Sequence, residues 1–556
     1  MTAASVVAFG DRAVLVRWEG SGPAHRLAAV VSQASADGPV DVSDIVVGSG
    51  SVLVHLAPGG AGPDVAVPWL RRVVGGSDPS AAPPGGGPPD GPVLELPVSF
   101  DGADLEEVAE TAGTDAAGVV GLLTGTELEV SFLGFSPGFP YLVGLPPPLA
   151  RVDRLATPRT AVPAGSVAVA GGFAAVYPQS TPGGWRLLGR TPVALFDPDR
   201  PPYARLAPGD RVRFTVAGAG ADTPPSVTTA TGVGGAPALP SPRWADVVRP
   251  GLLSLVQDGG RMGLAGAGVP GAGPADPDSM TLANRLVGNA DDEAAIEATG
   301  AGPALRFGVA AHCAVVGAGP GAVTVTVDGH PVPDGAVLPV AAGQVLDVGA
   351  VRTGLRAYVA VSGGFDTPVA VGSRSSDLLS GLGPGPLATG DRLGLGPPGR
   401  PQGLLAPAPG APGNGPGVLR ILVGPHDLGA PALEHLVAGG WSVDARSNRI
   451  GLRLAGTPVP GAGTRTVPST GMVTGAIQVP PDGNPIILMP DHATVGGYPV
   501  IGCVIAADLA ALGQLVAGDT VTFTPVDLGT ALDLEHRRVR ALASRVSGWF
   551  PTQAGI

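Results

Sequence analysis

The chain contains no lysine. Of its 556 residues, 33 are lysine or arginine, and all 33 are arginine. A phosphate-binding loop of the GxxxxGK[ST] type, a Schiff-base lysine and a biotinyl-lysine carrier are therefore excluded on this chain. Any phosphate or carboxylate has to be held by arginine side chains, backbone N–H groups or a metal ion.

Cysteine and long apolar runs are also scarce. The two cysteines, Cys313 and Cys503, lie in apolar, strand-like runs without metal-ligand spacing. We predict buried free thiols in a reducing compartment. No run approaches the ~18 apolar residues of a membrane helix, and the first residues lack the segments of a secretory signal. We therefore expect a cytoplasmic protein with no membrane partner.

Several kinds of site are disfavoured by charge and by missing motifs. The net charge of −13 argues against nucleic acid as a partner, because nothing offsets the repulsion of phosphates. The chain has no GxSxG, HExxH or CxxC motif, so serine-hydrolase and zinc chemistry lack support. A metal site is not assigned from these residues.

Glycine and proline, in contrast, are abundant, with 89 and 62 residues. They concentrate in blocks between Val-, Ile- and Leu-rich runs, and 44% of the chain is hydrophobic. This pattern predicts a mainly β, multi-domain protein with many turns. The Gly/Pro-rich blocks predict an α+β unit with its linker at 1–92, a β unit at 93–217, a linker at 218–244, β units at 245–400 and 401–530, and a helical tail at 531–556.

Two short signals recur in the three β units. Each unit contains a GGF or GGY triplet, and each later has a Gly-Asp pair that opens an alternating strand, as in LAPGDRVRF and LVAGDTVTF. We interpret the recurrence as three related β modules. The positions are Gly171–Phe173, Gly363–Phe365 and Gly496–Tyr498 for the triplets, and Gly209-Asp210, Gly390-Asp391 and Gly518-Asp519 for the pairs.

The stretch with the most functional polar groups is 469–523. The apolar run Ile486–Met489 ends at Pro490, Asp491 and His492, before the turn residues Gly496-Gly497. This pattern places an imidazole at a strand end beside backbone N–H groups, where a small polar molecule can be recognised. The alternative is a buried histidine that only caps a turn.

Other polar side chains extend the candidate site. Asp258 and Asp276 lie in Gly-rich turns, and Asp276 also precedes a predicted helix at 277–287 that it would N-cap. Arg374 lies among serines in what resembles an anion-holding loop, with plain solvent exposure as the alternative. Such a set suits a planar amide or carboxylate substrate, with histidine as acid or base. The remaining candidates are Asn448 and Gln478, and Arg159, Tyr177 and Arg186, which are predicted to converge in a cleft.

Long motifs carry a family resemblance. SFLGFSPGFPYLVGLP and TPRTAVPAGSVAVAGGFAAVYPQSTPGGWRLLGRTP resemble the B subunit of 5-oxoprolinase, whose family includes the Kip-type kinase inhibitor and allophanate hydrolase subunit 1. GLLSLVQDGGRMGLAGAGVPGAGPADPDSMTLANRLVGN and GAIQVPPDGNPIILMPDHATVGGYPVIGCVIAADL resemble the C subunit of the same enzyme. The two matches follow in the order B then C, and the corresponding regions are called the B part and the C part below. The same pair is similar to the carboxyltransferase domain of urea carboxylase.

The resemblance implies a cyclophilin-like β-barrel in the B part and two barrels in the C part. It implies ATP-dependent opening of 5-oxo-L-proline to L-glutamate, in which the lactam oxygen is activated by phosphorylation and ring opening is assisted by a separate A-type subunit. ATP and Mg²⁺ would be the cofactors. Carried over by motif, Asp491 and His492 would orient or protonate the amide and Gln478 would hydrogen-bond it. Asp258 and Asp276 would serve as metal or substrate carboxylates, and Arg374 and Arg449 would hold anions.

One motif departs from the family pattern. Where the family usually reads SGAMD, this chain has Ala272, Gly273, Pro274, Ala275 and Asp276. The serine and methionine are lost and the aspartate is kept. This change leaves the identity of the amide or lactam substrate open.

Three functions remain as alternatives. The first is a fused B–C component of 5-oxoprolinase, acting with an A-type 5-oxoprolinase protein. The second is a biotin-dependent carboxyltransferase acting on urea or a related amide, with the biotin carrier on another chain. The third is a non-catalytic regulator of a histidine kinase. Whether the chain forms a homo-oligomer stays open.

Overall fold

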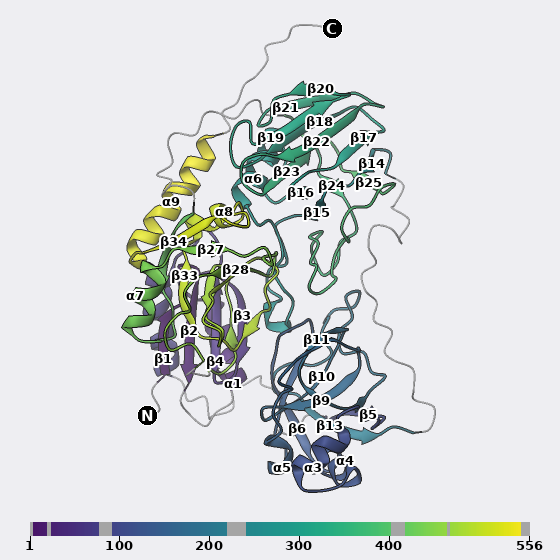
Figure 1. Cartoon of the computed structure of the whole chain (residues 1–556), viewed down its shortest axis with the longest axis vertical. Coiled ribbons are helices and arrows are strands. Elements are labelled where there is room, and N and C mark those ends of the chain that lie inside the picture. Colours follow the sequence, from purple (N-terminus) through teal and green to yellow (C-terminus); the bar gives the residue numbers. More distant parts are fainter. Residues whose placement is uncertain are drawn as a thin grey trace.

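The computed structural model describes residues 4–18, 24–76, 92–218, 241–401, 417–463 and 467–545. In this part of the chain strands predominate, which confirms the mainly β class. The predicted linkers lie largely outside the described residues, so the domain boundaries stay predictions. Figure 1 shows the B-part barrel and the first C-part unit at opposite ends of the molecule, with the N-terminal sheet beside the last barrel.

The N-terminal unit is an antiparallel sheet with strand order β1-β2-β4-β3, and helices α1 and α2 pack on one face. Its strands carry continuous apolar runs, as expected when both faces of a sheet are covered. The apolar runs AVLVRW and SVLVHL predict strands at Ala13–Trp18 and Ser51–Leu56, and the structure has a strand at each. The elements are β1 Ala4–Ala8, β2 Ala13–Trp18, α1 Ala24–Ser35, β3 Val42–Gly48, β4 Ser51–Leu56 and α2 Pro63–Gly75.

The second unit is a seven-stranded barrel with order β12-β9-β10-β7-β6-β13-β5. Ser99 and Arg190 exchange two backbone hydrogen bonds of 2.9 Å, which join the ends of the β5 and β12 edges. Strands β8 and β11 form a separate two-stranded flap. The elements are β5 Leu94–Val98, α3 Leu105–Ala112, α4 Ala116–Thr124, β6 Glu127–Leu133, β7 Pro140–Val143, α5 Pro147–Ala150, β8 Arg159–Val162, β9 Ser166–Ala170, β10 Phe173–Val176, β11 Thr181–Gly183, β12 Arg186–Arg190 and β13 Arg211–Val216.

The first C-part unit consists of two sheets around a shared core, ordered β20-β19-β22-β17-β14-β25-β24 and β15-β16-β23-β18-β21. Helix α6 packs on β18 and β23. The elements are β14 Trp244–Arg249, β15 Leu253–Gln257, η1 Ala265–Ala267, α6 Pro277–Leu286, β16 Ala295–Thr299, β17 Ala304–Phe307, β18 Ala311–Val316, β19 Val323–Val327, β20 His330–Val332, β21 Val337–Val340, β22 Val345–Val351, β23 Arg356–Val361, β24 Phe365–Asp366 and β25 Arg392–Leu395.

The last unit is a closed barrel, β26-β33-β30-β31-β28-β27-β34, with the flap β29-β32 and the long helix α9. The elements are β26 Val418–Val423, α7 Ala430–Ala438, β27 Trp441–Val443, β28 Gly451–Ala455, β29 Thr470–Gly471, β30 Ala476–Gln478, β31 Ile486–Leu488, β32 Val495–Gly496, β33 Val500–Val504, η2 Ala506–Asp508, α8 Leu509–Leu512, β34 Thr520–Pro525 and α9 Leu528–Ser544.

The two barrels share one topology. Numbered along the chain without their flaps, the strands of both follow the order 1-6-4-5-3-2-7, and in both the first and last strands pair in parallel. In both, the flap strands follow the third and fifth barrel strands. This agreement supports the predicted relation between these two modules and extends it from two short motifs to the whole barrel.

The Gly-Asp turn is the same in all three β units. In each, the glycine has φ between 92° and 96°, a conformation that favours glycine. The aspartate carboxylate accepts a hydrogen bond from the backbone N–H three residues earlier, at 2.8 Å for Asp210, 2.7 Å for Asp391 and 2.9 Å for Asp519. The turn therefore recurs in the first C-part unit, although the strand order there is different.

The N-terminal sheet is joined to the last barrel rather than only to its neighbour in sequence. Flap strand β29 packs on β3 and β4, and a Cβ added at Gly471 would lie 2.6 Å from the Leu53 side chain. The Ser49 N–H donates to the Ser469 carbonyl at 2.7 Å. The Asp11 carboxylate accepts from the Ala506 N–H at 2.9 Å. The B and C parts thus share an extensive packed interface.

Candidate functional site

A cavity of about 680 Å³ lies where the B and C parts meet. The N-terminal sheet, the first C-part unit, the last barrel and helix α9 all contribute to its wall. Its volume is in the range of small-molecule sites. Its polar lining includes Arg12, Asp44, His55, Arg261, Asp278, Arg285, Asp291, Asp292, His492, Glu535 and Arg538.

His492 lies in this wall, in the connection between β31, which ends at Leu488, and the β32 flap strand, near the strand end that the sequence predicts. Its Nδ1 is 2.8 Å from the Ala493 carbonyl. Because a carbonyl only accepts, this contact places the proton of a neutral ring on Nδ1 and leaves Nε2 as an acceptor. Burial lowers the pKa of His492 below its usual value. The ring is therefore a neutral imidazole whose Nε2 can accept a proton.

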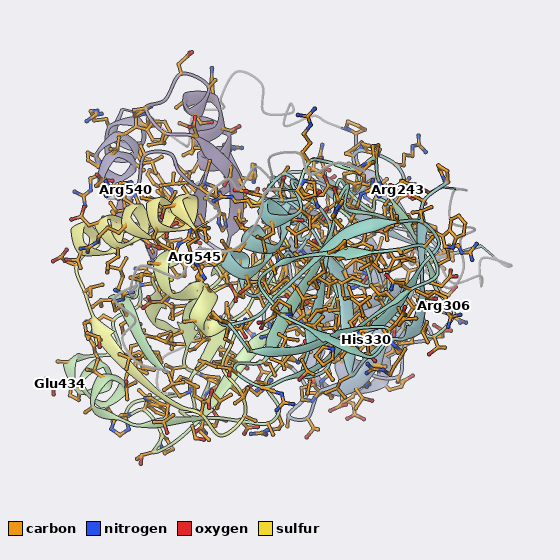
Figure 2. All side chains as sticks on the ribbon, turned by 90° about the horizontal axis from the view of Figure 1, so that it is seen from above. Arg243, Arg306, His330, Glu434, Arg540 and Arg545 are labelled. Atoms are coloured by element: carbon orange, nitrogen blue, oxygen red, sulfur yellow. The ribbon has the colours of Figure 1, made fainter. Side chains whose placement is uncertain are left out.

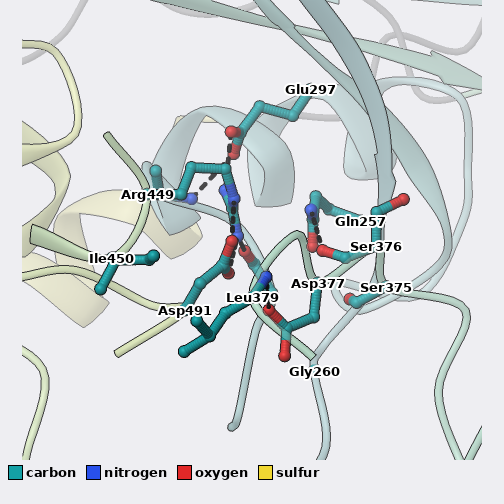
Figure 3. A network of polar contacts seen from close by, with 12 residues as sticks. Gln257, Gly260, Glu297, Ser375, Ser376, Asp377, Leu379, Arg449, Ile450 and Asp491 are labelled. Carbon is teal, nitrogen blue, oxygen red and sulfur yellow. Dashed lines mark hydrogen bonds and ion pairs between the residues drawn. The ribbon is translucent and has the colours of Figure 1, made fainter. Parts of the chain in front are cut away.

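Asp491 does not act with its neighbour. Its carboxylate receives two hydrogen bonds from Arg449, at 2.9 Å to Nε and 2.7 Å to Nη2, and its side chain is fully buried (Figure 3). Burial raises the pKa of Asp491, and the Arg449 contacts oppose that rise. The expectation that Asp491 and His492 jointly contact the amide is not supported by this geometry, because Asp491 is turned toward Arg449.

Arg449 is the centre of a buried ion-pair network (Figure 3). Its Nη1 donates to Glu297 at 2.7 Å, and its Nη2 also donates to the Gly273 carbonyl at 2.7 Å. Arg356 donates to the same Glu297 oxygen at 3.2 Å, and the Tyr358 hydroxyl donates to the other at 2.7 Å. Burial raises the pKa of Glu297, but the two guanidinium groups together lower it to about 2.

This network lies behind the cavity rather than in it. Arg449 was predicted to hold a substrate anion, but two protein carboxylates and a carbonyl occupy its guanidinium. The Gly273 carbonyl belongs to the loop that departs from the SGAMD pattern, and neighbouring residues of that loop line the cavity. The network therefore fixes the cavity wall at the boundary between the two C-part units.

Asp276 and Asp258 are both engaged by the protein. Asp276 N-caps α6, accepting from the Ser279 N–H at 3.0 Å, which confirms the predicted cap. It also accepts from Gln514 at 2.6 Å. Asp258 accepts from the Arg374 N–H at 2.6 Å and from the Ser375 hydroxyl at 2.7 Å. Neither carboxylate lines the cavity, and each organises a loop beside it.

The serine loop around Arg374 therefore binds a protein carboxylate. Ser373 and Ser375 donate to Asp258, and the Arg374 side chain pairs with Asp366 at 2.8 Å. The prediction that Arg374 holds a ligand anion is not supported by this arrangement. The loop does hold an anion, but the anion is an aspartate of the same chain.

Arg261, which the sequence patterns do not single out, is the buried cationic residue of the cavity wall. Its Nε donates to the Ala370 carbonyl at 3.2 Å and its Nη2 to the Ser375 carbonyl at 2.6 Å. Its Nη1 is buried and has no hydrogen-bond partner among the described residues. A guanidinium N–H without a partner is costly inside a protein, and an anionic group of a ligand would satisfy it.

The candidates in the B-part barrel do not belong to this cavity, and none of them lines it. Arg159 pairs with Asp104 at 2.7 Å, and Arg186 pairs with Glu107. Tyr177 is buried against Phe139, with ring centroids 5.1 Å apart. The predicted cleft at Arg159, Tyr177 and Arg186 is therefore filled by ion pairs and an aromatic core.

The two amide candidates have structural partners as well. The Asn448 oxygen accepts from the Ile450 N–H at 2.9 Å and stabilises a turn. Gln478 is buried at the end of β30, with its Nε2 3.4 Å from the Met472 sulfur. Since Met472 lines the cavity, Gln478 lies one layer behind the wall.

Helix α9, which was predicted only as a helical tail, also contributes to the cavity wall. Glu535 accepts hydrogen bonds from Arg12 of the N-terminal unit and from Arg538, the latter at 2.8 Å. Arg538 in turn pairs with Asp278 of α6. This chain of charges ties the three units together across the cavity. The missed signal was the pairing of acidic and basic residues three positions apart on a helix.

Asp278→Asn is expected to flatten the dependence of stability on pH. Burial, opposed by Arg538, raises the pKa of Asp278 to about 6. The folded state therefore holds this proton more tightly than the unfolded state, and protonation of Asp278 stabilises the fold. This stabilisation is full below about pH 4 and is lost as the pH rises to about 6. Between pH 4 and 7, the thermal midpoint of the wild type should change by several degrees more than that of Asp278→Asn. Asp533→Asn, on the exposed side of α9, serves as the control, and equal slopes for all three proteins would contradict the prediction.

Comparison with known proteins identifies the family. Residues 4–206 match the model "Carboxyltransferase domain, subdomain C and D", and residues 267–525 match "Carboxyltransferase domain, subdomain A and B". The chain is 36% identical over 303 residues to the C subunit of Escherichia coli K12 5-oxoprolinase, covering 53% of this chain and 95% of that protein. The chain belongs to this carboxyltransferase-domain family, whose members include the B and C subunits of 5-oxoprolinase and urea amidolyase.

Two further relatives match a part of the chain and nearly all of it. The chain is 49% identical over 129 residues to the B subunit of Escherichia coli O157:H7 5-oxoprolinase, covering 23% of this chain and 59% of that protein. The crystal structure of TTHA0988 superposes with a TM-score of 0.78 at 34% identity, covering 94% of this chain and all of that one. The predicted resemblance to both subunits is thus confirmed.

Three findings on the described residues concern membrane helices, metal ligands and cysteines. No helix in the described ranges is both long and apolar enough to cross a lipid bilayer. In the same part of the chain, no three histidine, cysteine, aspartate or glutamate side chains gather as a metal site would require. Cys313 and Cys503 are free and buried, as predicted.

Proposed function

We propose that the chain is the fused B–C component of an ATP-dependent 5-oxoprolinase. It would activate 5-oxo-L-proline for hydrolysis to L-glutamate together with a separate A-type 5-oxoprolinase protein in the cytoplasm. The observation that supports this most is the composite cavity. His55 and Asp44 come from the B part, whereas Arg261 and His492 come from the C part. A function that requires both parts is expected to use a site that both build.

The cavity offers the groups that lactam activation needs. A lactam is a poor electrophile, and phosphorylation of its oxygen would convert it to a better one. A neutral His492 can accept the amide proton as the oxygen gains a bond. Arg261 can hold an anion, either the substrate carboxylate or a phosphate.

The cavity residues suit the phosphates of ATP better than they suit a Mg²⁺ ion on its own. Arg261 lies in the cavity wall, and a guanidinium can bind a phosphate oxygen without any lysine. The described residues contain no ready-made metal cluster, so Mg²⁺ would be held by one or two carboxylates and the phosphates themselves. Asp292 lines the cavity, and its carboxylate has no partner among the described residues. When bound, Mg²⁺ would neutralise charge on the phosphates.

Reconstitution tests the proposal. Purified protein is mixed with an active A-type 5-oxoprolinase protein, ATP, Mg²⁺ and 5-oxo-L-proline, and glutamate and ADP are measured. We expect both products in equal amounts, and neither when this chain or the A-type protein is omitted. No turnover with an A-type protein of proven activity would overturn the proposal.

Two further assays distinguish the alternative functions. The chain matches only 18% of the length of the Saccharomyces cerevisiae urea amidolyase and has no lysine for biotin. Carboxylation of urea with a separately supplied carboxybiotin carrier would indicate the carboxyltransferase instead. Inhibition of a sensor kinase without turnover of any amide would indicate the regulator.

A further inference from the structure

Two histidines from different parts of the chain face the same cavity. We propose that His55 and His492 form a donor–acceptor pair that binds the edge of an amide on which C=O and N–H lie side by side. The inference deepens the proposed function and rests on it for the substrate, because the lactam of 5-oxoproline has such an edge. His55 is outside every motif considered in the sequence and would be a substrate-contacting residue supplied by the B part.

His492 provides the acceptor. The Ala493 carbonyl fixes the proton on Nδ1, at 2.8 Å. Nε2 has no hydrogen-bond partner among the described residues and retains its lone pair. A substrate N–H is the group that this atom can bind.

His55 provides the donor. It lies on β4 and lines the cavity, and neither ring nitrogen is hydrogen-bonded to a described residue. Nε2 is shielded from solvent. A buried acceptor without a partner costs less than a buried N–H without one, so the proton of the neutral ring belongs on Nδ1. Nδ1–H is then available to a substrate carbonyl.

No neighbouring side chain among the described residues hydrogen-bonds the His55 ring. Asp44 is paired with it across the β3–β4 ladder, but the Asp44 carboxylate accepts from the N–H groups of Ile45, at 2.8 Å, and Ala265, at 2.6 Å. Burial, together with the nearby His492, lowers the pKa of His55 to about 4, in keeping with a neutral ring. A buried polar ring with no protein partner is uncommon in a folded chain and indicates a missing ligand.

One donor and one acceptor at the same cavity select a class of ligand. In an open-chain secondary amide the peptide bond is trans, and C=O and N–H point in opposite directions. In a small lactam ring the bond is held cis, and both groups lie on one edge. A donor and an acceptor that line one cavity therefore favour lactams and primary amides over open-chain secondary amides.

Calorimetric titration of the full-length protein with matched ligands tests this pair. The ligands are 5-oxo-L-proline and its lactone analogue, in which a ring oxygen replaces N–H. The variants are His55→Leu, His55→Asn and His492→Leu, with His330→Leu as control because His330 is exposed on β20 (Figure 2). Asn is included because its amide N–H can take the place of the imidazole Nδ1–H.

We expect His55→Leu to weaken binding of both ligands about three- to tenfold, since each keeps its C=O. His55→Asn should restore most of the affinity. His492→Leu should weaken only the lactam and so abolish the preference for lactam over lactone. The thermal midpoint of His55→Leu should equal or exceed that of the wild type, because a buried group without a partner is removed.

Unchanged lactam binding in His55→Leu, or equal weakening of lactam and lactone in His492→Leu, would overturn the pair. Failure of the proposed function would look different. If hydantoin, a cis-amide ring without the carboxylate, binds with the same dependence on both histidines while 5-oxoproline does not bind, the proposed substrate is wrong and the pair stands. Binding of none of these rings would overturn the pair.

Discussion

Glu297→Gln is expected to lower the thermal midpoint of the protein by roughly 10 °C. The substitution keeps the shape of the side chain and removes its charge. Arg356 and Arg449 then lose the carboxylate that both contact, at 3.2 and 2.7 Å, in a fully buried site. Removing one partner from a buried ion pair costs about 3–5 kcal/mol, because the remaining charges cannot be solvated. For units of this size, each kcal/mol corresponds to about 2–4 °C.

The same substitution should also change how the molecule unfolds. Glu297 lies on β16 of the first C-part unit, whereas Arg449 precedes β28 of the last barrel. The pair therefore joins two units with separate cores. Differential scanning calorimetry of the variant should show the unfolding transition broadened or split into two.

A matched surface pair provides the control for this experiment. Asp246 and Arg392 also form two hydrogen bonds, at 2.7 and 3.1 Å, but both side chains are substantially exposed. Asp246→Asn should shift the midpoint by no more than about 2 °C, because exposed pairs contribute little. Equal shifts for the buried and exposed variants would show that the network does not hold the two units together.

The local parts of the fold were predictable from sequence. The strands Ala13–Trp18 and Ser51–Leu56 follow from their apolar runs, and the cap at Asp276 follows from its place before Pro277. His492 was placed at a strand end because the run before it stops at a proline. These features depend on a few neighbouring residues, so the sequence contains the whole signal.

The partners across the cavity were not predictable in this way. His55 and Arg261 each look ordinary in their own segments, and only the tertiary fold brings them to the wall that contains His492. Glu297 lies in the short strand AIEAT, where a single acidic residue is typical of a solvent-facing position. Its burial depends on Arg356 and Arg449, which come from distant segments.

Asp491 and His492 show why adjacency misled the functional interpretation. Both residues lie in the connection after β31, which ends at Leu488, and their side chains have different surroundings. Asp491 faces the Arg449 network, whereas His492 lines the cavity. Asp491 therefore supports the cavity wall from behind, and His492 lines the cavity. Substitution of Asp491 should lower stability, whereas substitution of His492 should lower activity.

His492→Ala is expected to reduce turnover in the reconstituted assay at least about 100-fold. This factor is typical for loss of a residue that accepts a proton in the reaction. The thermal midpoint should stay within a few degrees of the wild-type value. The ring bonds only the carbonyl of the adjacent Ala493 among the described residues, and it takes no part in the Arg449 network. His330→Ala, at an exposed site on β20, should leave turnover unchanged.

The pH profile provides a second measurement on the same residue. Burial lowers the pKa of His492, and the proposed role requires the neutral ring. Activity of the wild type should therefore be constant at neutral pH and fall on acidification, with a midpoint below about 6.5. In His492→Ala the residual activity should lack this acidic limb. Full activity in His492→Ala, or an unchanged acidic limb, would remove this imidazole from the reaction and leave Arg261 as the group that organises the cavity.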